Sequence, residues 1–330
     1  MIGERKQDHL DICMREKVEA GANSFDSIRL IHEALPELNF DEIKTDVTFL
    51  GKKLKYPILI NAITGGTKSS TKINRDIAEV AQEYGIGMGV GSQRAAIEDP
   101  QLEETFKVKD SAPNVPLLIA NLGAVQFNYG YGLKECKKAV DMINADAIAL
   151  HINPLHEVLQ PEGDKNFSNL IAKINKIASE LKVPVIAKCV GDGITEKTAR
   201  KLKVDAIDVA GVGGTSWSLV ESYRNQGVYR KVGVELAGWG VPTAEAIKQC
   251  ARLKKPLIGA GGIRTGIDAA KAIALGADVV GIALPVLKAW SLGSRDGIRE
   301  YLDKFTLELK IAMFLTGSKD VKSLKGRIVE

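Results

Sequence analysis

Short apolar runs recur along the chain, and each is followed by a segment in which apolar residues lie three or four positions apart. The first pattern is typical of buried strands, and the second is typical of helices with one apolar face. The predicted strands are residues 57–62, 86–91, 116–121, 145–151, 184–188, 205–210, 256–261 and 277–283. The clearest helical segments are residues 166–181, 195–202, 243–251 and 266–275.

This alternation predicts an α/β fold, and the number of strands favours a (β/α)8 TIM barrel. Strands that are apolar on both faces are typical of a parallel sheet covered by helices, and eight strand–helix units close into a barrel. An open, doubly wound sheet is the alternative, but it would need a Gly-x-Gly-x-x-Gly turn after its first strand. The sequence there is Asn61-Ala-Ile-Thr-Gly-Gly66, which does not match.

No linker or shift in composition divides the chain, so residues 1–330 are predicted to form a single domain. Residues 1–56 precede the first strand and form an N-terminal extension that contains a basic leader and a helix. Within it, residues 47–54 (VTFLGKKL) have the pattern of a β-hairpin. We expect the hairpin to close the barrel floor and the extension to contribute to the substrate site.

Composition and charge narrow the class of protein further. A chain that is 45% hydrophobic and 26% charged is typical of a globular protein, which excludes disordered and fibrous classes. The net charge of +4 is spread along the sequence, so we expect no nucleic-acid partner. No apolar run is long enough to cross a bilayer, and the charged N-terminus does not resemble a secretory signal. These features predict a cytoplasmic protein without a membrane span.

The four cysteines are predicted to be reduced thiols. Cys13, Cys136, Cys189 and Cys250 lie far apart in the sequence and form no Cys-x-x-Cys pair. This spacing argues against both a disulfide framework and a structural zinc site.

Polar residues gather where the predicted strands end. In a TIM barrel the loops after the strands meet at one face and carry the chemistry. The polar strand endings are Asn61, 64–66, 91–94, Asn121, His151, Asn153, Glu157, Lys188, 213–217 and 261–266. Amide, imidazole, guanidinium and ammonium groups at one face predict a small-molecule site with several anionic contacts.

Two anion sites are predicted within this face. Residues 261–266, which follow the seventh strand and begin a helix, favour the phosphate of a cofactor, and residues 281–284 would complete its seat. Lys188 ends an apolar strand, where it would pair either with the pyrimidine edge of a flavin or with a barrel carboxylate. The second site is Arg5-Lys6-x-x-His9 with Arg94 and His151, which suits a diphosphate; a solvated tail is the alternative for Arg5 and Lys6.

With these residues in place, the chain closely resembles the type 2, flavin-dependent isopentenyl-diphosphate isomerases over nearly its whole length. The shared motifs are Arg5-Lys6-x-x-His9, Thr64-Gly65-Gly66, Gly91-Ser92-Gln93-Arg94, His151-Ile-Asn153, Gln160-Pro161-Glu162-Gly163, Gly213-Gly214-Thr215-Ser216-Trp217, Trp239-Gly240-x-Pro242-Thr243 and Gly261-Gly262-Ile263-Arg264. Each motif alone is weak, but together and in this order they are specific.

The resemblance implies an FMN-binding barrel that converts isopentenyl diphosphate to dimethylallyl diphosphate by a 1,3-allylic proton shift. It implies reduced FMN, NAD(P)H as the reductant, Mg²⁺, and assembly as a homotetramer or homo-octamer. The residues implied to surround FMN are Thr64, Gly65, Gly66, Ser92, Asn121, Lys188, Thr215, Gly262, Arg264, Ala283 and Leu284. Those implied to hold the diphosphate are Arg5, Lys6, His9, Arg94, His151 and Asn153, and Glu157 is implied to bind Mg²⁺. His151, His156 and Glu157 are the expected catalytic residues.

One position departs from the family pattern. The family reads His-x-Asn-x-x-Gln-Glu, whereas this chain has His156 in place of the Gln that contacts the reacting end of the alkene. An imidazole titrates near neutrality and can exchange a proton more readily than an amide. We therefore expect activity with a changed proton relay; the alternative is a site adapted to another prenyl substrate.

Two other enzyme classes share this fold, and a flavin-binding protein without catalysis is a third alternative. A 2-hydroxy-acid oxidase would need His-Gly-x-Arg after the sixth strand, where this chain has Gly211-Val-Gly-Gly-Thr-Ser-Trp217, and a nucleotide dehydrogenase would need a cysteine there. A protein that only stores or senses flavin would have no use for the second cationic cluster. A related flavoprotein that binds prenyl diphosphates remains an alternative.

Overall fold

A closed barrel of eight parallel strands forms the centre of residues 2–329, which are the residues that the computed structural model describes. The strands are β3 (Ile58–Ile60), β4 (Gly87–Gly89), β5 (Leu118–Gly123), β6 (Ala147–Ile152), β7 (Val185–Cys189), β8 (Ala206–Asp208), β9 (Leu257–Ala260) and β10 (Val279–Ile282). They follow one another in chain order, and β10 closes on β3 with Ile282 opposite Ile60. Each lies within a predicted strand or overlaps it, so the (β/α)8 prediction is confirmed.

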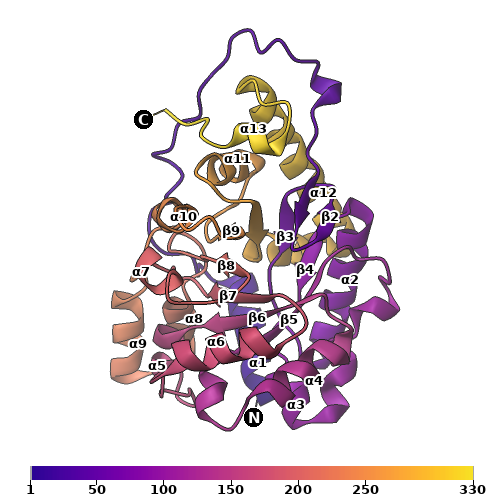
Figure 1. Cartoon of the computed structure of the whole chain (residues 1–330). Coiled ribbons are helices and arrows are strands. Elements are labelled where there is room, and N and C mark those ends of the chain that lie inside the picture. The colour runs from indigo at the N-terminus through magenta and orange to yellow at the C-terminus, as the bar shows by residue number, and fades with distance from the viewer. Residues whose placement is uncertain (1, 330) are drawn as a thin grey trace.

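Helices surround the barrel (Figure 1). They are α2 (Lys68–Tyr84), α3 (Arg94–Glu98), α4 (Leu133–Ile143), α5 (Pro154–Leu159), α6 (Leu170–Glu180), α7 (Glu196–Ala199), α8 (Trp217–Arg224), α9 (Gly227–Glu235), α10 (Thr243–Ala251), α11 (Gly266–Ala274), α12 (Leu284–Leu315) and α13 (Val321–Leu324). The prediction for α10 is confirmed residue for residue. The helix predicted to start at residue 166 begins at Leu170, because Asn166 Oδ1 accepts a bond from the Ser168 backbone N–H and forms a turn there.

The predicted hairpin is present and lies at the amino ends of the barrel strands. It consists of β1 (Val47–Phe49) and β2 (Lys52–Leu54), which pair antiparallel. Lys52 Nζ lies 2.6 Å from Oδ1 of Asp146, just before β6. The backbone N–H of Lys55 donates to the carbonyl of Gly85, just before β4. Both contacts place the hairpin at the floor of the barrel.

The N-terminal extension connects the two ends of the barrel. Helix α1 (Ile2–Arg15) packs against α8 and α12, whose first residues follow the carboxyl ends of β8 and β10. The chain then runs as a long indigo segment to the opposite end, beside the yellow C-terminal segment (Figure 1). There Leu30 pairs with Ile328 and Lys44 pairs with Asp320 as isolated bridges.

Two further expectations concern the cysteines and the membrane. All four cysteines are buried free thiols, as predicted. Over the described part of the chain, no helix combines the length and the apolar character that a bilayer crossing requires.

Candidate functional site

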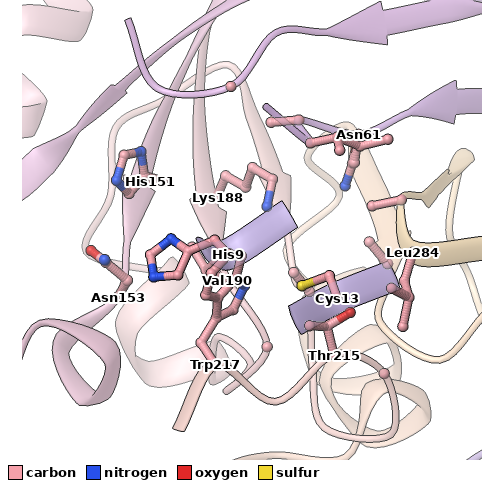
Figure 2. Close-up of a pocket in the computed structure, with 18 of the residues that line it drawn as sticks. His9, Cys13, Asn61, His151, Asn153, Lys188, Val190, Thr215, Trp217 and Leu284 are labelled. Carbon is pink, nitrogen blue, oxygen red and sulfur yellow. The ribbon is translucent and has the colours of Figure 1, made fainter. Parts of the chain in front are cut away.

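One cavity at the carboxyl ends of the strands brings together the predicted site residues (Figure 2). Those that line it are Arg5, Lys6, His9, Thr64, Gly65, Ser92, Arg94, Asn121, His151, Asn153, His156, Glu157, Lys188, Thr215, Gly262, Arg264, Ala283 and Leu284. Of the residues predicted for the site, Gly66 does not line the cavity; its backbone N–H donates to Thr105 Oγ1. The two predicted anion sites therefore open into a single space.

Lys188 enters the cavity beside a buried carboxylate. Its Nζ donates to the Cys189 carbonyl at 2.8 Å and lies 4.0 Å from Asp208 Oδ2. Asn61 Nδ2 donates to the same Asp208 oxygen at 2.8 Å. Burial raises the pKa of Asp208, and the charge of Lys188 opposes that rise. The barrel carboxylate that the sequence left open as a partner is thus present, while Lys188 also lines the cavity.

A glycine-rich wall lies on the β9 side of the cavity. Gly261 and Gly262 have positive φ angles of 100° and 73°, a conformation that other residues adopt only with strain. A Cβ at Gly262 would lie 2.6 Å from the Gly213 carbonyl oxygen, so the two loops touch through their backbones. Arg264 stabilises this contact: its Nη1 donates to the Gly262 carbonyl and its Nη2 donates to the Gly213 carbonyl.

Lys6 is held inside the mouth rather than in solvent. Its Nζ donates to the carbonyls of Gly65, at 2.5 Å, and Ser92, at 2.9 Å, and lies 5.3 Å from the centre of the Phe106 ring. Burial, with a smaller contribution from the charge of Arg5, lowers the pKa of Lys6 to about 7. The leader is therefore a helix over the barrel mouth, and the alternative of a solvated tail does not hold for this residue.

Arg94 is paired with two carboxylates. Its Nη1 donates to Asp164 Oδ2 at 2.6 Å, and its Nε donates to Glu98 Oε1 at 2.7 Å. Arg5 lies further from its nearest acid, with Nη1 3.9 Å from Glu162 Oε1. An anion that binds beside both guanidinium groups would compete with these acids for Arg94 more than for Arg5.

His151 is a neutral imidazole. Burial lowers its pKa to about 3, and the charge of Lys188 adds to this effect. The His151 Nδ1 atom lies 2.8 Å from Asn121 Oδ1, while Asn121 Nδ2 donates to the Val90 carbonyl. The Asn121 amide is thereby fixed with its oxygen toward the ring, so Nδ1 carries the proton and Nε2 is left as an acceptor.

His9 and His156 converge on one carboxylate that the sequence analysis missed. Glu221 Oε1 accepts from His9 Nε2 at 2.7 Å and from His156 Nε2 at 3.0 Å. Burial alone would raise the pKa of Glu221, but the bonds from the two imidazoles hold it well below its usual range. Burial lowers the pKa of His9 to about 4. The sequence could have indicated Glu221, because it lies four residues after Trp217 and therefore on the same face of α8.

An aromatic side chain completes this cluster. The His156 ring stacks on Trp217 with ring centroids 4.7 Å apart, and His9 meets the same indole edge-on at 5.1 Å. Figure 2 shows His9 and Trp217 side by side in the cavity. The stacking holds the His156 ring in one plane.

Glu157 is buried, and both of its carboxylate oxygens accept hydrogen bonds from N–H groups. Its Oε1 accepts from Asn153 Nδ2 at 2.9 Å, and its Oε2 accepts from the Asp164 backbone N–H at 2.8 Å. Among the described residues, three buried side-chain polar atoms have no hydrogen-bond partner, and two of them are amide oxygens that belong to this region, Gln126 Oε1 and Asn153 Oδ1. Such unpartnered oxygens favour the binding of a hard cation.

Comparisons with known proteins agree with this fold and with a flavin cofactor. A family model for FMN-dependent dehydrogenases matches residues 136–330. A solved flavocytochrome b2 variant with pyruvate bound has a TM-score of 0.70 at 15% identity, over 97% of this chain and 82% of that one. A mandelate oxidase variant has a TM-score of 0.67 at 16% identity, over 97% and 94% of the two chains. Fold and family model together define a flavin-dependent (β/α)8 barrel enzyme.

Proteins with related sequences define the family more narrowly than the fold does. An isopentenyl-diphosphate delta-isomerase of Nostoc sp. is 47% identical over 329 residues, which cover 97% of this chain and 93% of the relative. That of Ignicoccus hospitalis is 46% identical over 336 residues, with 98% and 92% covered. The chain belongs to the isopentenyl-diphosphate delta-isomerase family, and the resemblance drawn from its motifs is confirmed.

Proposed function

We propose that this chain isomerises isopentenyl diphosphate to dimethylallyl diphosphate with reduced FMN and Mg²⁺, after reduction of the flavin by NAD(P)H. Membership of the isomerase family supports the reaction. The observation that carries the proposal is one cavity with two anion seats, a glycine-lined wall at Gly261 and Gly262 and a cationic cluster of Arg5, Lys6 and Arg94.

The residues on the β9 and β10 side fit FMN. Gly262 and Arg264, together with Ala283 and Leu284, line the cavity and would seat the phosphate. The first turn of α11 does not contribute as the sequence predicted, because the N–H groups of Gly266 and Asp268 already donate to Glu308 and Thr265. Lys188 lies deeper in the cavity, where its ammonium group would meet the pyrimidine edge of the ring. The remaining proposed contacts are Thr64, Gly65, Gly66, Ser92, Asn121 and Thr215. When bound, reduced FMN supplies an electron-rich ring that stabilises positive charge on the substrate and exchanges a proton.

The second seat fits a diphosphate ester. Arg5, Lys6 and Arg94 supply positive charge, and Asn153 supplies an amide beside them. His9 and His151 complete the proposed set; His151 Nε2 is an acceptor in the free protein, so it would accept a hydrogen bond from a protonated phosphate oxygen or a water. Helix α1 carries three of these residues, which makes closure of the mouth part of substrate binding.

The surroundings of Glu157 fit Mg²⁺. Its carboxylate is a hard ligand of the kind that Mg²⁺ prefers, and Gln126 and Asn153, whose amide oxygens are unpartnered, line the same cavity. Waters and diphosphate oxygens would fill the remaining positions. Glu157 would hold the ion against the diphosphate and so orient the alkene.

The reaction needs a proton added at the terminal methylene and one removed from the neighbouring carbon. His156, whose Nε2 atom bonds to Glu221, would donate or hold such a proton. Trp217 and Leu284 line the same space and exclude water, which would trap a cation. A histidine here also admits the second candidate, an isomerase for another prenyl diphosphate.

The proposal extends to assembly and location. We expect a homotetramer or homo-octamer in the cytoplasm. Val228, Tyr229 and Val234 on α9 expose apolar surface, as does Trp239 nearby, and such surface favours contact with another copy. Light scattering of the holoenzyme measures the assembly directly.

Binding of labelled isopentenyl diphosphate to the holoenzyme tests the assignment. We expect binding that depends on Mg²⁺ and tightens when FMN is reduced. A flavin-storage protein would bind no diphosphate in either state. A 2-hydroxy-acid oxidase would instead lose its colour on addition of lactate or mandelate, and that result would replace the proposal.

A further inference from the structure

Three side chains at the cavity, His9, His156 and Glu221, form a set of possible metal ligands in addition to the roles proposed for them in the isomerisation. Each of the three offers one ligand atom, and these atoms all lie within 4.8 Å of one another. The imidazole rings meet at 61° with centroids 5.6 Å apart, so neither ring covers the nitrogen of the other. Two imidazole nitrogens and one carboxylate oxygen are a ligand set for zinc, whereas Mg²⁺ prefers oxygen alone.

We propose that His9, His156 and Glu221 form a binding site for Zn²⁺, or for a similar late first-row ion, separate from the magnesium position at Glu157. In the free protein the two imidazoles bond to the same carboxylate oxygen, at 2.7 Å and 3.0 Å. Neighbouring ligands of a tetrahedral zinc ion lie roughly 3.3 Å apart, so the ion replaces these two protons after shifts of about 0.3 to 0.6 Å.

The surroundings balance the charge of such an ion. Arg224 donates from Nη1 to the other oxygen of Glu221 at 2.7 Å, which fixes Oε1 toward the histidines. Its guanidinium is itself neutralised by Glu162, at 3.1 Å, and by Asp8, at 3.6 Å. Together with Arg5, the group contains two positive side chains, Arg5 and Arg224, and three negative ones, Glu221, Glu162 and Asp8. Its net charge is therefore negative, which favours a cation beside it.

A second observation concerns the outer partner of His156. A histidine that binds metal through Nε2 carries its proton on Nδ1 and donates it to an oxygen. The His156 Nδ1 atom lies 3.3 Å from Asn153 Nδ2, and the Asn153 Oδ1 atom is buried without a hydrogen-bond partner. A half-turn of this amide would supply the missing acceptor only by breaking the bond that Asn153 Nδ2 makes to Glu157 Oε1, so the zinc and magnesium positions compete for this side chain. The fourth position of the metal opens into the cavity beside Trp217.

Zinc binding by the oxidised FMN holoenzyme tests the site without substrate and without turnover, so its outcome is independent of the proposed isomerase activity. We would dialyse the protein against micromolar ZnCl₂ in millimolar MgCl₂ and count the metal retained per chain. We expect one zinc in the wild type and at least about tenfold weaker retention in both His156→Gln and His9→Gln, because loss of even an outer partner costs roughly 10- to 100-fold.

His32→Gln is the matched control, since it removes the one histidine that does not line the cavity. It should retain zinc like the wild type, and retained FMN shows that each variant is folded. Anomalous scattering at the zinc edge then locates the ion. The proposal is wrong if the wild type retains no zinc, if both cluster variants retain it unchanged, or if the anomalous signal lies at Cys13 instead.

Discussion

The Nε2 atom of His156 lies 3.0 Å from Oε1 of Glu221, a carboxylate whose side chain has no exposed surface. This contact joins the one position where the chain departs from its family pattern to an acid that the sequence analysis did not single out. Because the imidazole is held by Glu221 on one edge and by the face of Trp217, its Nε2 atom has a fixed direction in the cavity.

Removal of the Glu221 charge is therefore expected to impair turnover more than folding. In Glu221→Gln the amide no longer holds the two imidazoles as an anion does, and we expect kcat to fall by about 10². Steady-state kinetics with a melting curve for each variant measures this. Glu162→Gln is the control, because Glu162 also bonds to Arg224 but its side chain is half-exposed. This substitution should lower kcat less than about threefold. Equal losses would remove the His156–Glu221 contact from the mechanism.

A second prediction concerns proton uptake at Lys6. Burial lowers its pKa to about 7, so the free protein holds the amine neutral above that pH and charged below it. A bound diphosphate favours the charged form and raises this pKa. Binding at about pH 8 should therefore take up nearly one proton per site, and affinity should weaken by up to about tenfold per pH unit above 7.

Calorimetry of diphosphate binding in two buffers with different ionisation enthalpies measures that uptake. Lys6→Met should abolish it, whereas Lys17→Met, at an exposed position on the same extension, should leave it unchanged. Uptake that persists in Lys6→Met would assign the proton to another group.

Glu157 is the subject of a third prediction. Replacement by Gln removes the charge that would hold Mg²⁺, and Mg²⁺-dependent turnover should be lost. Glu98→Gln is a suitable control because Glu98 is a carboxylate that bonds to Arg94, a cavity residue, but does not itself line the cavity. A magnesium titration of the rate is the measurement. Turnover by Glu157→Gln with an unchanged magnesium dependence would exclude this carboxylate from the site.

The glycine wall gives a fourth prediction. In Gly262→Ala the new Cβ meets the Gly213 carbonyl at 2.6 Å and the positive φ is strained, which costs roughly 1–2 kcal/mol. FMN should bind at least about tenfold more weakly, as measured by flavin fluorescence during titration. Gly238→Ala, which would meet no atom within 4 Å, should bind FMN normally. The same FMN affinity in both variants would show that the cofactor does not use this wall.

The barrel could be predicted from the sequence because its strands are continuous apolar runs. Every residue of β3 and β9, for example, is buried, and no alternation of polar residues obscures them. The strand endings then placed His151, Lys188 and Arg264 at one face, since the topology of the barrel leaves no other arrangement.

The electrostatic state of the site could not be predicted in the same way. Glu221 lies in a helix with polar neighbours and resembles a solvated residue, and its burial depends on α1, from more than 200 positions earlier in the chain. His151 was expected to help bind an anion, but burial of its ring and the nearby charge of Lys188 lower its pKa and favour the neutral form. The pairing of Arg94 with Asp164 joins two loops that no local pattern connects.

Anaerobic incubation of the holoenzyme with isopentenyl diphosphate, Mg²⁺ and chemically reduced FMN tests the central claim most directly. We predict dimethylallyl diphosphate as the product, with no net oxidation of the flavin and no reaction when FMN stays oxidised. Unchanged isopentenyl diphosphate, under conditions in which the protein binds FMN, would contradict the account.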